Sequence, residues 1–257
     1  MSNKPSVVLV HGFWGGAAQW AKVIVELNGR GYGSLHAVEN PLTSLSDDAE
    51  RTRKMVKQVD GPVLLVGHSY GGAVITEAGD LPNVVGLVYV AAFAPDAGES
   101  LNQIGEWLPS PALGNVEWDS DGYVWIKQDK FHESFCQDLP TDEALVMAVT
   151  QKAPVGSIFG ETISDPAWKK KPTWYQVSSD DRMIPPVTER RIAERMAKQV
   201  FTDADTRGLV RAVFLFEADE ETIRRTALGR GRGIDRRTRS EQDVQVRLNE
   251  LYGVDPC

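Results

Sequence analysis

One pentapeptide, Gly67-His68-Ser69-Tyr70-Gly71, constrains this chain more than any other feature. It directly follows the apolar run 63–66 and directly precedes 72–75, an apolar stretch suited to the start of a helix. A Gly-x-Ser-x-Gly turn between strand and helix holds its serine in a strained, exposed conformation, and the glycines leave room for the sharp turn. The pattern therefore predicts a nucleophile elbow with Ser69 as the nucleophile.

Short β-branched runs alternate with helical stretches along the chain. This alternation predicts an α/β fold, a mostly parallel sheet with helices on both faces. Strands are expected at 6–10, 34–38, 63–66, 84–92 and 173–177, and a helix is expected from Pro186. Ser46 is the expected N-cap of the helix before the third strand, because acidic residues follow it and basic residues come later, as the helix dipole favours.

The 257 residues, 42% of them hydrophobic, are enough for one large domain and too few for two of typical size. We therefore expect a single domain over 1–257 with a cap inserted at about 95–171, where the strand pattern stops and one helix is expected at 141–150. The cap is rich in aromatic residues. These can line a substrate pocket or pack the cap onto the sheet, and the sequence does not separate the two roles. They are Trp107, Trp118, Trp125, Phe131 and Phe135.

The composition changes after about residue 200. Residues 201–257 hold ten arginines and no lysine, whereas 1–200 hold seven arginines and eleven lysines. The run 229–233, Gly-Arg-Gly-Arg-Gly, resembles a phosphate-binding loop only superficially, because no strand leads into it, and we interpret it as flexible. The segment can be a divergent terminus, an engineered replacement or the product of a shifted reading frame.

Composition also limits the partners that the chain can have. The formal net charge of −8 argues against a nucleic-acid partner. Two cysteines imply no disulfide framework, which suits a cytoplasmic location. The apolar run 7–10 is too short for a signal peptide or a membrane span. No zinc-type ligand spacing and no phosphate-loop motif of the Walker type occurs, so no metal is expected.

Serine catalysis needs donors for the oxyanion, a carboxylate and a base. The backbone N–H groups of Tyr70, which follows the nucleophile, and of Phe13, in the loop after the first strand, are the expected oxyanion donors. Asp180 and Asp181 both follow a late strand, so either can be the carboxylate that orients a base. The residues alone leave that choice open.

The base is the difficulty, because the chain has only four histidines. His11 directly follows a strand, where an imidazole usually orders the turn, and His68 lies inside the elbow and should point away from Ser69. His36 alternates within a strand. His132 lies in the cap between Phe131 and Phe135, where a pocket role is possible. None of the four is a strong candidate for the base.

Five segments resemble the α/β-hydrolase superfamily, and within it the small bacterial esterase-like members related to plant methylesterases and hydroxynitrile lyases. They are VHGFWGG (10–16), NPLTSL (40–45), GHSYGG (67–72), VYVAAFAPD (88–96) and DRMIPP (181–186). The resemblance implies the α/β-hydrolase fold, no cofactor, Ser69 as the nucleophile and Asp181 rather than Asp180 as the triad acid. It also supports Phe13 and Tyr70 as the oxyanion donors.

The resemblance also implies a catalytic histidine roughly 25 to 30 residues after the acid, and the chain departs from it there. The window 203–209 reads DADTRGL, and Arg207, the nearest residue by position, cannot accept a proton. The leading hypothesis is a serine hydrolase of small carboxylic esters, a monomer or a homodimer. The alternatives are an impaired or non-catalytic ligand-binding member of the family and an enzyme resembling hydroxynitrile lyases.

Overall fold

The computed structural model describes residues 4–196 and 199–202, so the window 203–209 and the glycine-arginine run at 229–233 lie outside the described residues. Six parallel strands form the central sheet, in the order β2-β1-β3-β4-β7-β8. Their bounds are Ser6–Val10 (β1), Leu35–Val38 (β2), Val63–Ser69 (β3), Val84–Ala92 (β4), Thr173–Val177 (β7) and Gln199–Thr202 (β8). The five predicted strands are confirmed.

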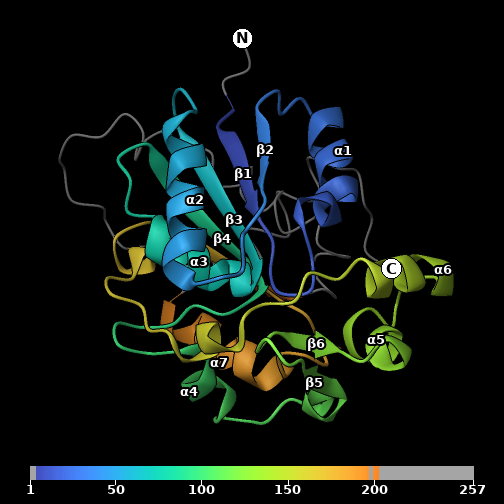
Figure 1. Cartoon of the computed structure of the whole chain (residues 1–257). Helices are drawn as coiled ribbons and strands as arrows, with labels where there is room; N and C mark the ends of the chain where they lie inside the picture. Colours follow the sequence, from blue (N-terminus) through green and yellow to red (C-terminus); the bar gives the residue numbers. More distant parts are fainter. Residues whose placement is uncertain (1–3, 197–198, 203–257) are drawn as a thin grey trace, which may run out of the picture.

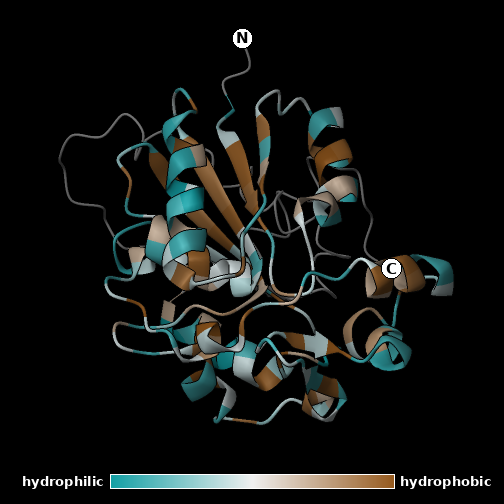
Figure 2. Ribbon diagram, viewed as in Figure 1, coloured by the Kyte–Doolittle hydropathy of each residue, from teal (hydrophilic) through white to brown (hydrophobic). Residues whose placement is uncertain are grey.

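Helices cover both faces of this sheet (Figure 1). The short 3-10 helix η1 (Ala17–Trp20) and α1 (Ala21–Gly29) pack Trp20, Val23 and Leu27 against one face. On the other face lie α2 (Leu45–Lys57), α3 (Tyr70–Ala78) and α7 (Pro186–Met196). A strand that is buried on both faces has a continuous run of apolar residues. Figure 2 accordingly shows the sheet as the most hydrophobic part of the molecule. The predicted α/β fold is confirmed.

The start of α2 differs from the prediction. Ser44, not Ser46, is the N-cap: its backbone is extended, and its hydroxyl accepts a hydrogen bond from Asp47 N at 3.0 Å. Ser46 lies exposed in the first turn. Both serines precede acidic residues, so the local sequence favours either of them, and the path of the loop after β2 decides which one has the extended conformation that a cap requires.

Residues 95–171, called the insert below, leave the sheet after β4 and return to it before β7. The insert lies beyond the carboxyl ends of the strands (Figure 1). It contains α4 (Leu101–Gly105), η2 (Pro111–Asn115), the hairpin of β5 (Val116–Trp118) and β6 (Val124–Ile126), α5 (Gln128–Phe135), α6 (Thr141–Val149), η3 (Gly156–Gly160) and η4 (Ala167–Lys169). The helix predicted at 141–150 is present as α6.

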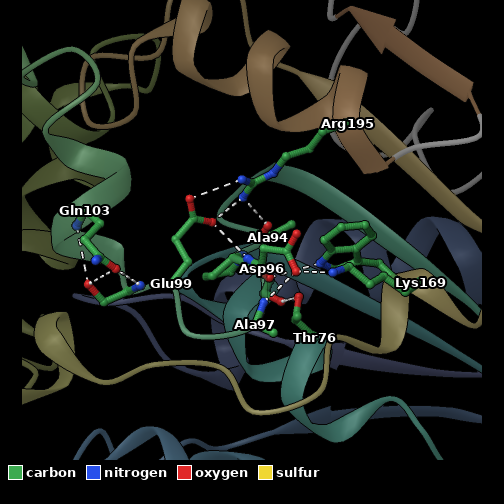
Figure 3. A network of polar contacts seen from close by, with 12 residues as sticks. Thr76, Ala94, Asp96, Ala97, Glu99, Gln103, Lys169 and Arg195 are labelled. Atoms are coloured by element: carbon green, nitrogen blue, oxygen red, sulfur yellow. Dashed lines mark hydrogen bonds and ion pairs between the residues drawn. The ribbon is translucent and has the colours of Figure 1, made fainter.

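A polar network ties the two ends of the insert together (Figure 3). Asp96, at its start, forms an ion pair with Lys169, near its end. Arg195 of α7 donates to Glu99 Oε2 at 2.6 Å and to the Ala94 carbonyl at 2.8 Å. The two ends of the insert therefore lie next to each other, and the first of them is hydrogen-bonded to α7, a helix that covers the sheet.

The insert is also hydrogen-bonded to the loops after β1 and β2. Trp14 Nε1 donates to the Val124 carbonyl at 2.8 Å, and Trp14 N donates to the Lys152 carbonyl at 3.0 Å. Val155 N donates to the Leu42 carbonyl at 3.0 Å. These bonds hold the insert over the carboxyl ends of the strands, where β3 ends with Ser69.

The aromatic residues of the insert have different environments. Phe131 is fully buried, and its ring centroid lies 5.0 Å from that of Phe135. Trp107 lies under the guanidinium of Arg191 on α7, 4.0 Å from the ring centroid. Trp118 is 64% exposed. Phe131 and Trp107 therefore pack the insert onto itself and onto α7, whereas Trp118 faces solvent.

Candidate active site

Ser69 ends β3 and directly precedes α3, at the predicted turn. Its backbone has φ 53° and ψ −125°, a region that costs on the order of 1–3 kcal/mol for a residue other than glycine. Phe93 N, at the end of the neighbouring strand, donates to the Ser69 carbonyl at 3.1 Å and helps to hold this conformation. The side chain is half-buried, and in the described part of the chain no hydrogen bond involves its hydroxyl. The predicted elbow is present, and the role of Ser69 as nucleophile stays a prediction.

Two glycines allow the loop after β1 to approach this turn. A Cβ atom on Gly71 would lie 2.3 Å from the Val10 carbonyl oxygen, and one on Gly12 would lie 2.7 Å from Ser69 Cβ. Real Cβ atoms essentially never come this close to another heavy atom. The elbow and the loop after β1 therefore contact each other directly through backbone atoms.

Backbone strain is concentrated around Ser69. The described residues other than glycine with a positive φ are Trp14 at 58°, Leu42 at 62°, Ser69 at 53° and Ala91 at 43°. They lie after β1, after β2, at the end of β3 and near the end of β4, which are four neighbouring strands. Strained residues cluster at functional sites, because surrounding contacts must hold them in place. The strained backbone therefore identifies the carboxyl ends of these four strands as the candidate site.

The two predicted oxyanion donors lie against each other. The Phe13 ring stacks on the Tyr70 ring, with centroids 4.1 Å apart and planes 14° from parallel. Tyr70 is the first residue of α3, so its N–H has no acceptor within the helix. In the described part of the chain, the Phe13 N–H also has no acceptor. Two unpaired donors next to one serine are what an oxyanion requires, and their role stays a prediction.

His11 is unsuited to act as a base. Its Nε2 accepts a hydrogen bond from Asn40 N at 3.0 Å, so Nδ1 carries the proton and donates to the Gly12 carbonyl at 2.7 Å. The side chain is fully buried, and burial lowers its pKa. Both ring nitrogens therefore hold the loops after β1 and β2, as the sequence suggested for this imidazole.

The other three histidines also have structural contacts. His68 lies edge-on to Trp20, with centroids 6.3 Å apart, and burial lowers its pKa to about 4. His36 contacts the Ser34 hydroxyl at 3.3 Å. His132 Nε2 donates to the Leu139 carbonyl at 2.9 Å within the insert. All four histidines lie in the described residues, and no imidazole is hydrogen-bonded to the Ser69 hydroxyl, so the site has no imidazole base.

Of the two candidate carboxylates, Asp181 is the one that backbone N–H groups hold in place. Its Oδ1 accepts from Met183 N at 2.7 Å and from Ile184 N at 2.8 Å. Burial raises its pKa, whereas these two backbone bonds and a hydrogen bond with Glu189 oppose the rise. Asp180 is exposed. No histidine is hydrogen-bonded to Asp181 in the described part of the chain, and the role of Asp181 as the triad acid stays a prediction.

The described residues hold no cluster of histidine, cysteine and acidic side chains suited to a metal ion. Among the described helices, none is long and apolar enough to cross a membrane.

The sequence matches the family model of the alpha/beta hydrolase family over residues 7–224. This chain belongs to the α/β hydrolase family. A curated relative, an α/β hydrolase of Aspergillus novofumigatus, is 28% identical over 75% of this chain and 84% of its own length. Methylesterase 8 of Arabidopsis thaliana is 28% identical over 70% of this chain and 74% of its own length. The predicted resemblance to this superfamily and its esterase-like branch is confirmed.

Solved structures share this fold. Polyneuridine aldehyde esterase superimposes on the α/β hydrolase described here with a TM-score of 0.69 at 15% identity, over 85% of this chain and 97% of that one. A pyrethroid hydrolase of Sphingobium faniae gives 0.68 at 18% identity, over 86% of this chain and 97% of that one. At these identities the likeness establishes the fold alone.

Sequence reasoning missed one buried side chain of this α/β hydrolase. Asp48, in the first turn of α2, is fully buried. Its Oδ2 accepts from the Tyr70 hydroxyl at 2.6 Å, and its Oδ1 accepts from Leu42 N at 2.9 Å. The sequence presented it as one of several acidic residues that favour a helix start, and no local pattern distinguishes it from exposed Asp47.

Asp48 should make the stability of this α/β hydrolase depend on pH. Burial raises its pKa from 3.8 to about 6; the hydrogen bonds from Tyr70 and Leu42 and the charge of Lys152 oppose the rise, and the charge of Asp47 adds to it. Because the folded-state pKa lies above the unfolded one, the contribution of Asp48 to stability is fully present below about pH 4 and is lost as the pH rises through about 6. The loss amounts to about 3 kcal/mol.

Urea unfolding between pH 4 and pH 8 checks this prediction with Asp48→Asn, which keeps the shape and removes the titration. The stability of the wild type relative to Asp48→Asn should fall over that range. Asp47→Asn is the matched control, because it removes the same charge one residue away on the exposed side of α2. Equal pH slopes for the two variants would contradict the prediction.

Proposed function

We propose that this α/β hydrolase is an esterase that acts on small carboxylic esters through an acyl-enzyme on Ser69. The observation that carries the proposal is a strained serine, φ 53°, next to two backbone N–H groups without acceptors, those of Phe13 and Tyr70. Esterase relatives, including a carbendazim-hydrolysing esterase of Nocardioides that is 36% identical over 37% of this chain and 44% of its own length, support the choice of substrate class.

In the proposed reaction, Ser69 Oγ attacks the ester carbonyl carbon, and the electron pair of the carbonyl bond moves to its oxygen. The N–H groups of Phe13 and Tyr70 donate to that oxygen, and one such donor is worth on the order of 10²–10³ in rate. The intermediate then expels the alcohol and leaves the acyl group on Ser69, which water removes as the carboxylic acid.

The serine proton must pass to water in this chain, because no imidazole contacts Ser69. Loss of the base costs on the order of 10⁶ in kcat in a well-studied serine hydrolase, and we expect a deficit of that order here. In this proposal Asp181 is the triad acid, but it has no imidazole to orient. The proposed esterase is therefore slow, and both acylation and deacylation are limited by the proton transfer.

Intact-mass spectrometry after incubation with p-nitrophenyl acetate or butyrate tests the proposal. The wild type should gain one acetyl or one butyryl group, because a base-deficient site also deacylates slowly, and peptide mapping should assign the group to Ser69. Ser69→Ala should gain none at this peptide. An unmodified wild type would contradict the proposal.

The alternative, a protein that binds a ligand without chemistry, gives a different result in the same samples. It predicts thermal stabilisation by the ester that survives Ser69→Ala, with no acyl group on either protein. Both outcomes are measurable on one preparation, so the experiment distinguishes the two functions.

A further inference from the structure

Asp48 is a fully buried carboxylate near the candidate site, and its two hydrogen bonds join three segments. Its own helix α2, the elbow residue Tyr70 and the loop residue Leu42 meet at this one side chain. A buried charge is a poor source of stability, because the loss of hydration offsets most of what its partners return. Because Asp48 lies next to the elbow, we look for a role of this carboxylate other than stabilising the fold.

The first hydrogen bond holds strained backbone. Leu42 N donates to Asp48 Oδ1 at 2.9 Å, and Leu42 has φ 62°, which is unusual for a bulky side chain. The Leu42 carbonyl accepts from Val155 N of the insert at 3.0 Å. Asp48 thus fixes the point at which the insert is attached to the loop after β2.

The second hydrogen bond reaches the oxyanion donors. The Tyr70 hydroxyl donates to Asp48 Oδ2 at 2.6 Å, which fixes the far end of the Tyr70 ring. The Phe13 ring stacks on this ring at 4.1 Å and also contacts Phe159 of the insert at 4.7 Å. Phe13 lies in a loop outside the described helices and strands, so these ring contacts help to determine where its backbone N–H points.

We propose that Asp48 is a positioning residue for the oxyanion hole. It holds the Tyr70 ring as a platform for the Phe13 ring, so that the N–H of Phe13 stays next to Ser69. This inference rests on the proposed function, because it concerns an oxyanion formed at Ser69. It adds a residue that does not touch the substrate and acts through Tyr70.

A trifluoromethyl ketone, phenyl trifluoromethyl ketone, is the probe, with acetophenone as its matched control. Ser69 Oγ adds to the activated carbonyl carbon, the carbonyl electron pair moves to the oxygen, and the serine proton passes to solvent. The adduct therefore requires the oxyanion donors, whereas acetophenone forms no comparable adduct. Fluorine NMR measures the equilibrium affinity of the adduct, which does not depend on how fast a missing base lets it form.

Asp48→Ala and Tyr70→Phe should each weaken the adduct by about tenfold, a part of the effect of losing one donor, and leave the binding of acetophenone within about twofold. Asp48→Asn should stay within about threefold of the wild type, because its amide donates to the tyrosine oxygen and its carbonyl accepts from Leu42 N. The double variant Asp48→Ala/Tyr70→Phe should lose about tenfold in total, since the two residues act along one path.

The inference is overturned if Tyr70→Phe or folded Asp48→Ala binds the trifluoromethyl ketone as tightly as the wild type does. Equal weakening of both ketones overturns it too, because that result means general damage to the site. If Asp48→Ala does not fold, Tyr70→Phe and Asp48→Asn still decide the question. A wild type without a Ser69-dependent adduct refutes the proposed function itself, and this inference with it.

Discussion

Added imidazole should raise the rate of ester hydrolysis by the wild-type protein by about ten- to a hundredfold over the rate without it. A general base held in place contributes through an effective concentration of 10⁵–10⁸ M, so a freely diffusing base restores only a small part of a loss on the order of 10⁶. The reason for expecting rescue is specific to this site. In the proposed mechanism, Ser69 is the nucleophile and the N–H groups of Phe13 and Tyr70 bind the oxyanion, so the missing element is a proton acceptor.

The rescue should depend on Ser69 and on the neutral form of imidazole. Ser69→Ala in the same imidazole solution is the matched control, because imidazole hydrolyses activated esters by itself and this variant measures that background. The increase should grow with pH as more imidazole becomes neutral, since only the neutral form accepts a proton. An equal increase in Ser69→Ala would mean that the imidazole acts in solution and not at the site.

Gly71→Ala should lower the free energy of unfolding by about 3–5 kcal/mol, which is a large part of the stability of a typical domain. The new Cβ would lie 2.3 Å from the Val10 carbonyl oxygen and 2.9 Å from that of His11. Both are backbone atoms, one in the last residue of β1 and one in the residue after it, so no side-chain rotation relieves the clash, and β1 is an interior strand of the sheet. The elbow and the loop after β1 would have to separate.

Guanidinium unfolding measures this effect, with Gly105→Ala as the matched control. Gly105 ends α4, and a Cβ there meets no heavy atom within 4 Å, so this variant should stay within about 0.5 kcal/mol of the wild type. If the two variants have similar stabilities, the close contact between the elbow and β1 is not as tight as described.

Much of the fold could be predicted because its signals are local. The run Val84–Ala92 is apolar throughout, which is typical of a strand buried on both faces, and β4 has these bounds. The elbow at Ser69 was equally predictable, because the glycines of its motif are required by contacts with the neighbouring backbone. The start of α2 was not, since Ser44 and Ser46 both precede acidic residues and only the loop geometry selects Ser44.

The sequence by itself determined the alternation of strands and helices along the chain, the elbow with its strained serine, and the absence of a suitable histidine. Each of these depends on residue type and spacing. Only the tertiary structure decided that Asp48 is buried against Tyr70 and Leu42, that His11 is hydrogen-bonded at both ring nitrogens, and that backbone N–H groups hold Asp181 whereas Asp180 is exposed. The physical reason is that burial and hydrogen bonding join residues far apart in sequence: Tyr70 lies 22 residues from Asp48.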